Sequence, residues 1–519
     1  MIEKSKIVKY AGSVSVGTTI SRIFGYIRDM LVAYLFGAGM FADAFYAAFR
    51  IPNLLRRMLG EGSFSAAFIP VFSEYLHTKP KEETQKLINV VFTLLSLTLI
   101  IVVILGVFFS PLLVKIIAYG FTSDPEKMQL TIDLTRLMFP FLLFICLAAM
   151  LLALLNTLSS FFIPAIAPAN LSFAEIIYIL ALAPMLSPAN QIKGLAISVI
   201  FGGMGHFFMQ YPVLKQLGWK LSIDFSFKHP AIKKIVFLMI PSIISISVDQ
   251  INTFVDTICA SFLANGSITA LYYSNRLMQL PLAIFGLAMA TVSLPLMSKA
   301  VAKKDITEVA QTLNFSIRFS VIALLPAMMG LIAVGLPIIQ VLFERGKFDI
   351  YASLLTNKAL FYYSLGLPAY AISKVLANTF FSFQDTKTPL KIAIINMIIH
   401  TILCVALMYY LDVGGLALAT AICAYINAYM LARYLRKKIG TIGIKTILKS
   451  SIKGFISSAI MGVICYMIIK LNFANIFISL PISIIAGMVS FILISKVLKI
   501  QEIEILFNSF SKRYNAKAK

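Results

Sequence analysis

The chain is poor in charged residues and in the patterns that build metal, disulfide and nucleotide sites. Only 13% of its 519 residues are charged, against about 25% in soluble domains. Its four histidines and five cysteines share no metal-ligand spacing and form no CxxC pair, which argues against zinc and disulfides. The sequence has no GxxxxGK[ST] phosphate loop and no convincing acid–base or nucleophile constellation. We therefore expect neither an ATPase nor another enzyme, and no bound cofactor.

Long hydrophobic runs take the place of these motifs. Hydrophobic residues make up 59% of the chain and the mean hydropathy is +0.89. We count about fourteen apolar stretches near the ~20 residues that one helical span needs, which predicts an all-α polytopic membrane protein. The first stretch contains arginines and lacks a small-residue cleavage pattern, so we expect a retained span and not a signal peptide. The stretches centre on Gly25, Arg50, Leu99, Leu143, Ile177, Gly202, Ser247, Leu282, Ala327, Gly366, Ile398, Ala421, Ile460 and Ile485.

The net charge of +23 comes from basic residues in short loops between the apolar stretches. Loops rich in lysine and arginine alternate with loops that hold few, which is typical of cytoplasmic and external loops in membrane proteins. The loop before the thirteenth stretch alone holds seven basic residues between Arg433 and Lys453. This alternation predicts cytoplasmic N- and C-termini, and it makes nucleic acid the wrong partner to infer from the charge.

Ionisable residues are concentrated in the segment from Thr18 to Tyr75, although this segment is apolar enough for a bilayer. Each such residue at membrane depth costs on the order of 3 kcal/mol, so a cluster indicates a function. On the first helix, polar residues follow i, i+3, i+4, i+7 spacing, which predicts a wet cationic face opposite an apolar one. Pro52 and the Gly60–Gly62 break predict an interrupted second span beside a cavity. The candidate site residues here are Arg22, Arg28, Asp29, Asp43, Arg50, Arg56, Arg57 and Glu61.

A cluster of guanidinium groups suits a diphosphate, because each offers planar, bidentate donors. Arg276, in an apolar stretch of the second half, is a further member of this candidate set. The alternative is structural: the arginines reach an interface or pair with Asp43 and Glu61. We interpret Asp29, next to Arg28, as a residue that orients the arginines.

An internal repeat divides the chain. Asp29 corresponds to Asp256, and Arg50 corresponds to Arg276 after a one-residue slip. We therefore expect two six-helix lobes in parallel order, at residues 1–220 and 221–440, and an appended helical pair with a tail at residues 441–519. Duplicated halves with a site at their interface are typical of transporters.

Acidic residues in the second half suggest a candidate cation site. Asp256 lies in the seventh stretch, and Asp385 and Thr401 could complete the ligand set. The alternative is that these carboxylates bind neighbouring hydroxyls or arginines. Na⁺, H⁺ and chloride all stay open as coupling ions.

Four segments closely resemble the MurJ (MviN) family of bacterial lipid II flippases: SRIFGYIRD, GAGMFADAFYAAFRIPNLLRRMLGEGSFSAAFIPVFSEY, YYSNRLMQLPLAIFGLAMATVSLPLMS and QDTKTP. The resemblance covers essentially the whole chain. It implies the fourteen-helix fold of the multidrug/oligosaccharidyl-lipid/polysaccharide exporters, with two lobes around a cavity and a groove for the lipid tail on the last two helices. The family's essential arginines match Arg22, Arg28, Arg56 and Arg276. Asn275 departs from the family pattern, since Asp often precedes the last of these arginines.

The resemblance implies a monomer in the bacterial cytoplasmic membrane that flips lipid II, the undecaprenyl-diphosphate-linked disaccharide pentapeptide, for cell wall synthesis. Two alternatives remain within the superfamily: a flippase for another polyprenyl-linked glycan, and a cation-coupled drug antiporter, for which acidic and aromatic cavity walls are expected. A membrane enzyme acting on lipid diphosphates is the alternative from a different class.

Overall fold

Every regular element in the described part of the chain is helical. The computed structural model describes residues 2–471 and 475–505, with side chains except at 2–11, 61, 189, 244–246, 248 and 249. A bilayer favours helices because backbone N–H and C=O groups find no water there and must pair within their own segment. The predicted all-α class is confirmed.

The helices form two compact units. The first unit comprises Met1–Ile268 and Arg345–Phe348, and the second comprises Thr269–Glu344 and Asp349–Lys519. The elements of the first unit are α1 (Ile2–Phe36), α2 (Met40–Arg56), η1 (Arg57–Glu61), α3 (Ser63–Thr78), α4 (Lys81–Phe108), α5 (Ser110–Ile117), η2 (Tyr119–Ser123), α6 (Pro125–Met138), α7 (Phe141–Thr157), α8 (Phe162–Ile166), α9 (Ala169–Ile177), η3 (Tyr178–Leu182), η4 (Ala183–Met185), α10 (Pro188–Gln216) and α11 (Pro230–Ser261).

The core of the first unit is aromatic. Phe64, Phe68 and Phe72 lie one turn apart on α3 and stack with ring centroids 5.0 and 5.5 Å apart. They pack with apolar residues of α4, α7 and α10 and with the start of α11. Helix α11 therefore belongs to the first unit, whereas we expected the first lobe to end near residue 220.

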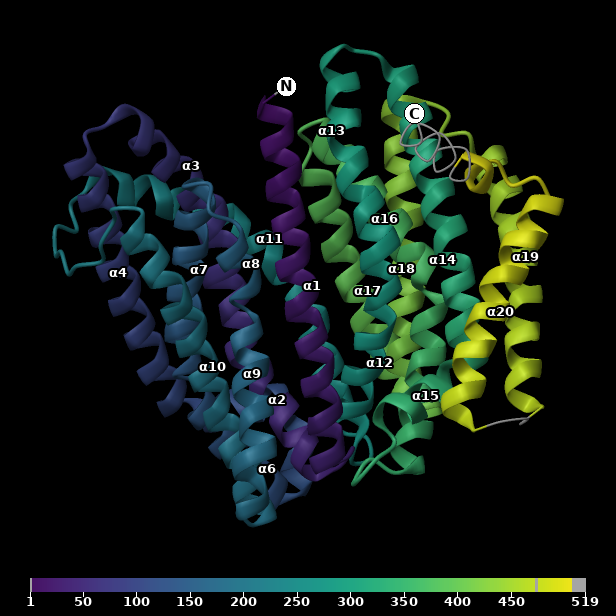
Figure 1. Cartoon of the computed structure of the whole chain (residues 1–519), viewed down its shortest axis with the longest axis horizontal. Coiled ribbons are helices and arrows are strands. Elements are labelled where there is room, and N and C mark those ends of the chain that lie inside the picture. Colours follow the sequence, from purple (N-terminus) through teal and green to yellow (C-terminus); the bar gives the residue numbers. More distant parts are fainter. Residues whose placement is uncertain (1, 472–474, 506–519) are drawn as a thin grey trace. The chain divides into compact units, whose positions relative to one another are not determined.

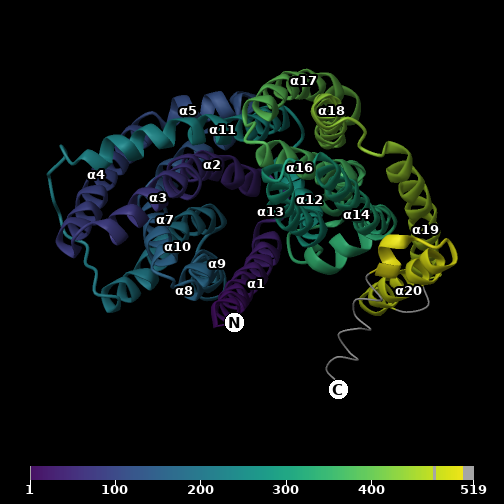
Figure 2. The same ribbon diagram turned by 90° about the horizontal axis from the view of Figure 1, so that it is seen from above.

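The second unit ends in the helical pair that the sequence set apart. Helices α19 and α20 pack on each other and on α14, and their shared core includes Ile322, Met461 and Phe491 (Figures 1 and 2). The elements of this unit are α12 (Ser267–Pro281), η5 (Leu282–Leu287), α13 (Ala288–Ala302), α14 (Ile306–Phe343), α15 (Ile350–Leu365), α16 (Leu367–Ser382), α17 (Lys387–Leu411), α18 (Val413–Ile439), α19 (Ile444–Lys470) and α20 (Ile476–Val497).

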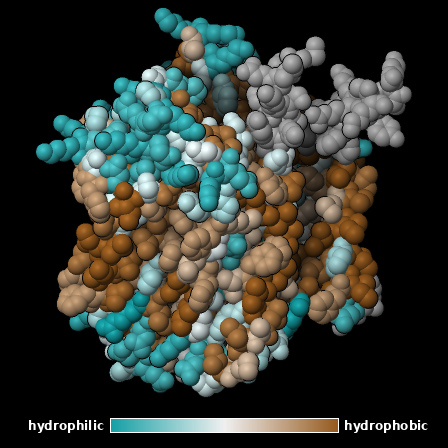
Figure 3. All heavy atoms as spheres, turned by 60° about the vertical axis from the view of Figure 1, so that its left-hand side comes forward, coloured by the Kyte–Doolittle hydropathy of each residue, from teal (hydrophilic) through white to brown (hydrophobic). Residues whose placement is uncertain are grey.

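Nine helices of the described chain are long and apolar enough to cross a membrane by length and composition. They include α6 joined to α7 and α12 joined to α13. The other five predicted stretches correspond to α1, α2–η1–α3, α9–η3, α11 and α15–α16, which are interrupted or carry several polar residues. The face drawn in Figure 3 is hydrophobic across its middle and hydrophilic at both ends, as expected of a membrane-spanning protein.

The order of elements supports the predicted repeat. The shift of 226 residues that relates Arg50 to Arg276 also carries η1 onto η5 to within one residue. Both η1 and η5 are π-helical turns that join two helices of similar length, α2 to α3 and α12 to α13. The predicted interruption of the second span is therefore present at η1, while the helix continues through Pro52.

Candidate substrate-binding site

Helix α1 carries Arg28 and Asp29 on one side and two exposed isoleucines on another. Arg28 Nε and Nη2 donate to Asp29 Oδ1 at 3.1 and 2.7 Å. The Asp29 side chain is buried, whereas 14% of the Arg28 side chain is exposed. On the other side of the helix, Ile23 and Ile27 are exposed, as suits contact with lipid or with another apolar surface. Asp29 is therefore in hydrogen-bond contact with Arg28, and the orienting role stays a prediction.

Arg28 has a second acidic partner that sequence reasoning missed. Glu175, in α9, places Oε1 3.7 Å from Arg28 Nη1 and is 3% exposed. Helix α9 packs against α1, which brings two residues 147 positions apart in sequence together (Figure 1). A sequence signal existed, because Glu175 is the one charged residue between Arg136 and Lys193.

The second group of arginines lies around the π-turn η1. Arg56 Nε donates to Asn53 Oδ1 at 3.0 Å, which fixes the guanidinium beside the turn. Its charge acts on His206 of α10, a buried histidine that the sequence did not single out. Arg50 is half-buried and Arg57 is exposed. The side chain of Glu61 lies outside the described part of the structure.

Asp43 is part of a buried clasp. Its Oδ2 accepts hydrogen bonds from Lys127 Nζ at 3.0 Å and from the Gly266 amide at 2.7 Å. Lys127 also donates to Asn265 Oδ1 at 2.7 Å and lies 4.0 Å from the centroid of the Phe121 ring. The clasp joins α2, α6 and the turn after α11, which favours a structural role for Asp43.

The other two predicted arginines lie in different environments. Arg22 is exposed on α1, in the same unit as Arg28 and Arg56. Arg276 is half-buried in α12 and belongs to the second unit. The structure therefore brings Arg28, Asp29 and Glu175 into direct contact, and it places the remaining candidates on neighbouring or separate elements.

Two of the three residues of the candidate cation site, Asp385 and Thr401, lie too far apart to share one ion. Asp385 precedes α17 and Thr401 lies fourteen residues into it, about 21 Å along the helix axis at 1.5 Å per residue. Thr401 donates to the carbonyl of Met397 at 3.0 Å, while Asp256 lies in α11 of the other unit. One ion cannot bind both Asp385 and Thr401, so this ligand set is corrected.

Asp385 instead holds two chain segments together. Its Oδ1 accepts from the Thr388 amide at 3.0 Å, and its Oδ2 accepts from the Thr388 hydroxyl at 2.8 Å and from Lys438 Nζ. Burial alone would raise the pKa of this carboxyl, but the bonds from Lys438 and Thr388 outweigh it and hold the pKa at about 2. The carboxylate therefore acts as a link between α17 and the end of α18.

This depressed pKa predicts a pH-dependent stability. Asp385 stabilises the fold above the ordinary aspartate pKa of about 4, and the contribution is lost as pH falls from about 4 to about 2. We expect Asp385→Asn to lower the apparent melting temperature in detergent at neutral pH, with the gap to wild type closing below about pH 4. Asp412→Asn, which removes an exposed partner of Lys358 2.9 Å away, is the matched control and should change little. A gap that persists at low pH would contradict this role.

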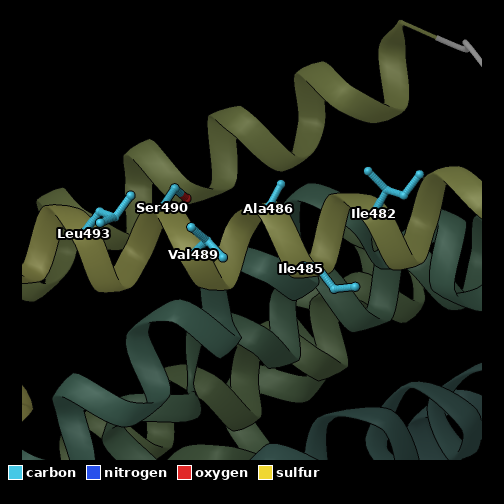
Figure 4. Close-up of a pocket in the computed structure, with 6 residues that line it drawn as sticks. All are labelled: Ile482, Ile485, Ala486, Val489, Ser490 and Leu493. Atoms are coloured by element: carbon cyan, nitrogen blue, oxygen red, sulfur yellow. The ribbon is translucent and has the colours of Figure 1, made fainter. Parts of the chain in front are cut away.

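An apolar groove follows one face of α20. The lining residues recur at helical spacing and all but one are apolar (Figure 4): Ile482, Ile485, Ala486, Val489, Ser490 and Leu493. The sequence analysis predicted no individual residues here. The groove has the chemistry of a hydrocarbon contact.

Comparison with known proteins identifies relatives over most of the chain. The family model described as lipid II flippase MurJ matches residues 32–486. The chain is 38% identical over 435 residues to a probable lipid II flippase MurJ of Vibrio cholerae, covering 82% of each chain. It is 35% identical over 430 residues to the lipid II flippase MurJ of Burkholderia cenocepacia, covering 82% of this chain and 83% of that one.

Solved structures of related proteins also resemble this chain. A lipid II flippase MurJ in an inward closed conformation matches with a TM-score of 0.79 and 32% identity over 93% of this chain and 98% of that one. An inward-facing multidrug transporter of the MATE family matches with a TM-score of 0.66 at 14% identity, over 83% of this chain and 98% of that one, which shows a common fold. The chain is therefore a multi-pass bacterial membrane protein that belongs to the MurJ family of lipid II flippases, a family of transporters and not of enzymes.

Proposed function

We propose that this chain carries lipid II from the inner to the outer leaflet of the cytoplasmic membrane by alternating access, without chemistry on the substrate. The observation that carries the proposal is Arg28, a guanidinium in an apolar helix that Asp29 holds in place and that remains 14% exposed. A charge in such a setting is energetically costly, so its presence indicates a function. The diphosphate of lipid II offers paired anionic oxygens that match the planar fork of an arginine.

Each of the four arginines matched to the family pattern takes part in holding the diphosphate during the cycle: Arg22, Arg28, Arg56 and Arg276. Asp29 orients Arg28, and the remaining candidates near the π-turn tune the local charge. The polyprenyl tail stays in lipid and lies along the apolar groove of α20, where it meets side chains of its own kind. We further propose a monomer with both termini in the cytoplasm, since the basic loops alternate along the whole chain.

Complementation tests the function directly. The host's own lipid II flippase is depleted, this gene is supplied, and the lipid II accessible on the outer leaflet is quantified. We expect growth and outer-leaflet lipid II to be restored relative to an empty vector. Failure of rescue, with the protein verified in the membrane, would contradict lipid II as substrate and favour another polyprenyl-diphosphate glycan.

A further inference from the structure

Two buried carboxyl groups approach the Arg28 guanidinium. Asp29 and Glu175 both approach it, at 2.7 and 3.7 Å, and their side chains are 1% and 4% exposed. Two ionised carboxylates against one guanidinium would leave a net negative charge in a buried part of the membrane helices, which is strongly unfavourable. A site with that charge would also repel the anion that we propose it binds.

The two carboxylates are not equivalent. Asp29 accepts two hydrogen bonds from Arg28, at 3.1 and 2.7 Å. Glu175 lies at ion-pair distance only, at 3.7 Å, on the remaining terminal nitrogen of the guanidinium. A diphosphate that replaces Glu175 at that nitrogen leaves the Arg28–Asp29 pair intact.

Among the described residues, Arg28 and Asp29 are the charged groups that act on Glu175. Its own helix, α9, packs against α1, α10 and η3. From α10, the buried His206 is subject to the charge of a different arginine, and from η3, the Tyr178 hydroxyl donates to a backbone carbonyl at 2.8 Å. Within the described part of the chain, the charge of Glu175 is therefore set against that of Arg28 and Asp29.

We propose that Glu175 is a resident counter-ion of Arg28, and that the diphosphate of the substrate reaches Arg28 only when the Glu175 carboxyl carries a proton. Ionised Glu175 lies beside Nη1 of the guanidinium and opposes an incoming anion. Protonation removes that charge, so the diphosphate replaces the carboxylate as the partner of Arg28. Loading of substrate is then accompanied by uptake of one proton on Glu175. This inference deepens the proposed function and rests on it.

The test is a binding measurement on the purified full-length protein in nanodiscs. The probe is a fluorescent lipid II with a shortened prenyl chain, whose diphosphate diester keeps its charge across the range used. We expect wild type to bind more tightly at about pH 6 than at about pH 8, by up to the roughly hundredfold that one linked proton allows over two pH units. Glu175→Gln should bind tightly at both pH values, since its amide cannot ionise. Glu175→Asp should keep the pH dependence, and Glu308→Gln, at an exposed glutamate, should behave like wild type.

A separate arm distinguishes this inference from the proposed function. Arg28→Ala and Arg28→Lys should weaken binding of the same probe at both pH values. If they do so while Glu175→Gln leaves the pH dependence unchanged, the counter-ion role is wrong and the proposed site stands. If the Arg28 variants bind like wild type, the proposed site is wrong and the counter-ion role fails with it.

Discussion

Arg28→Ala is expected to abolish lipid II flipping. The substitution removes a guanidinium that we propose forms two charge-assisted hydrogen bonds to the diphosphate, each contributing about 1.5–3 kcal/mol. Their loss corresponds to a decrease in affinity of roughly 100-fold or more. A cell that depends on this gene should then stop growing and show little lipid II on its outer leaflet. The measurement is complementation of a depleted strain, with outer-leaflet lipid II quantified beside growth.

The controls separate loss of function from loss of fold. Arg28→Ala also takes the cation away from two buried carboxyls, so membrane insertion and thermal stability must be measured for the same protein. Arg28→Lys keeps the charge but loses the planar fork, and should give partial activity. Arg433→Ala, at an exposed arginine near the end of α18, should rescue fully. Normal growth with Arg28→Ala as the sole copy would contradict the proposed role.

Most of the fold follows from local pattern. Apolar length predicts a helical span wherever it reaches about 20 residues, because the bilayer admits few alternatives. Position-by-position similarity between the segments that contain Arg50 and Arg276 predicts the repeat. The matching π-turns η1 and η5 agree with it. The lobe boundary could not be found in this way, because α11 joins the first unit through packing of its apolar side against α3. Local composition does not determine which other helix a given helix packs against.

Contacts in the candidate site can be predicted where the two residues lie close together in sequence, and are missed where they lie far apart. Arg28 and Asp29 are adjacent, so the helical period alone places them together. Glu175 and Lys127 could not be assigned partners, since their contacts join helices far apart in the chain. Asp385 and Thr401 show the opposite error, because two polar residues near one helix suggested a joint site that its length forbids.

Lys127→Met is expected to destabilise the protein by about 3–5 kcal/mol, the cost of removing one partner from a buried ion pair. Lys127 and Asp43 are 3% and 1% exposed, and the ammonium also bonds Asn265 and faces the Phe121 ring. Methionine keeps the length of the side chain but leaves the Asp43 carboxylate without its cation. The readout is the unfolding midpoint of the purified protein in detergent, compared with wild type.

A surface pair in the same unit provides the matched control. Lys193 lies 3.7 Å from Asp133, with side chains 42% and 32% exposed, so Lys193→Met should cost less than about 1 kcal/mol. Adding Asp43→Asn to Lys127→Met should recover part of the loss, because the buried negative charge then disappears together with its partner. Recovery would show that the clasp acts through charge balance, which is also the basis of the relation between Arg28 and Glu175. Equal effects of Lys127→Met and Lys193→Met would mean that Asp43 finds full compensation elsewhere, and that burial of an ion pair does not decide its importance in this fold.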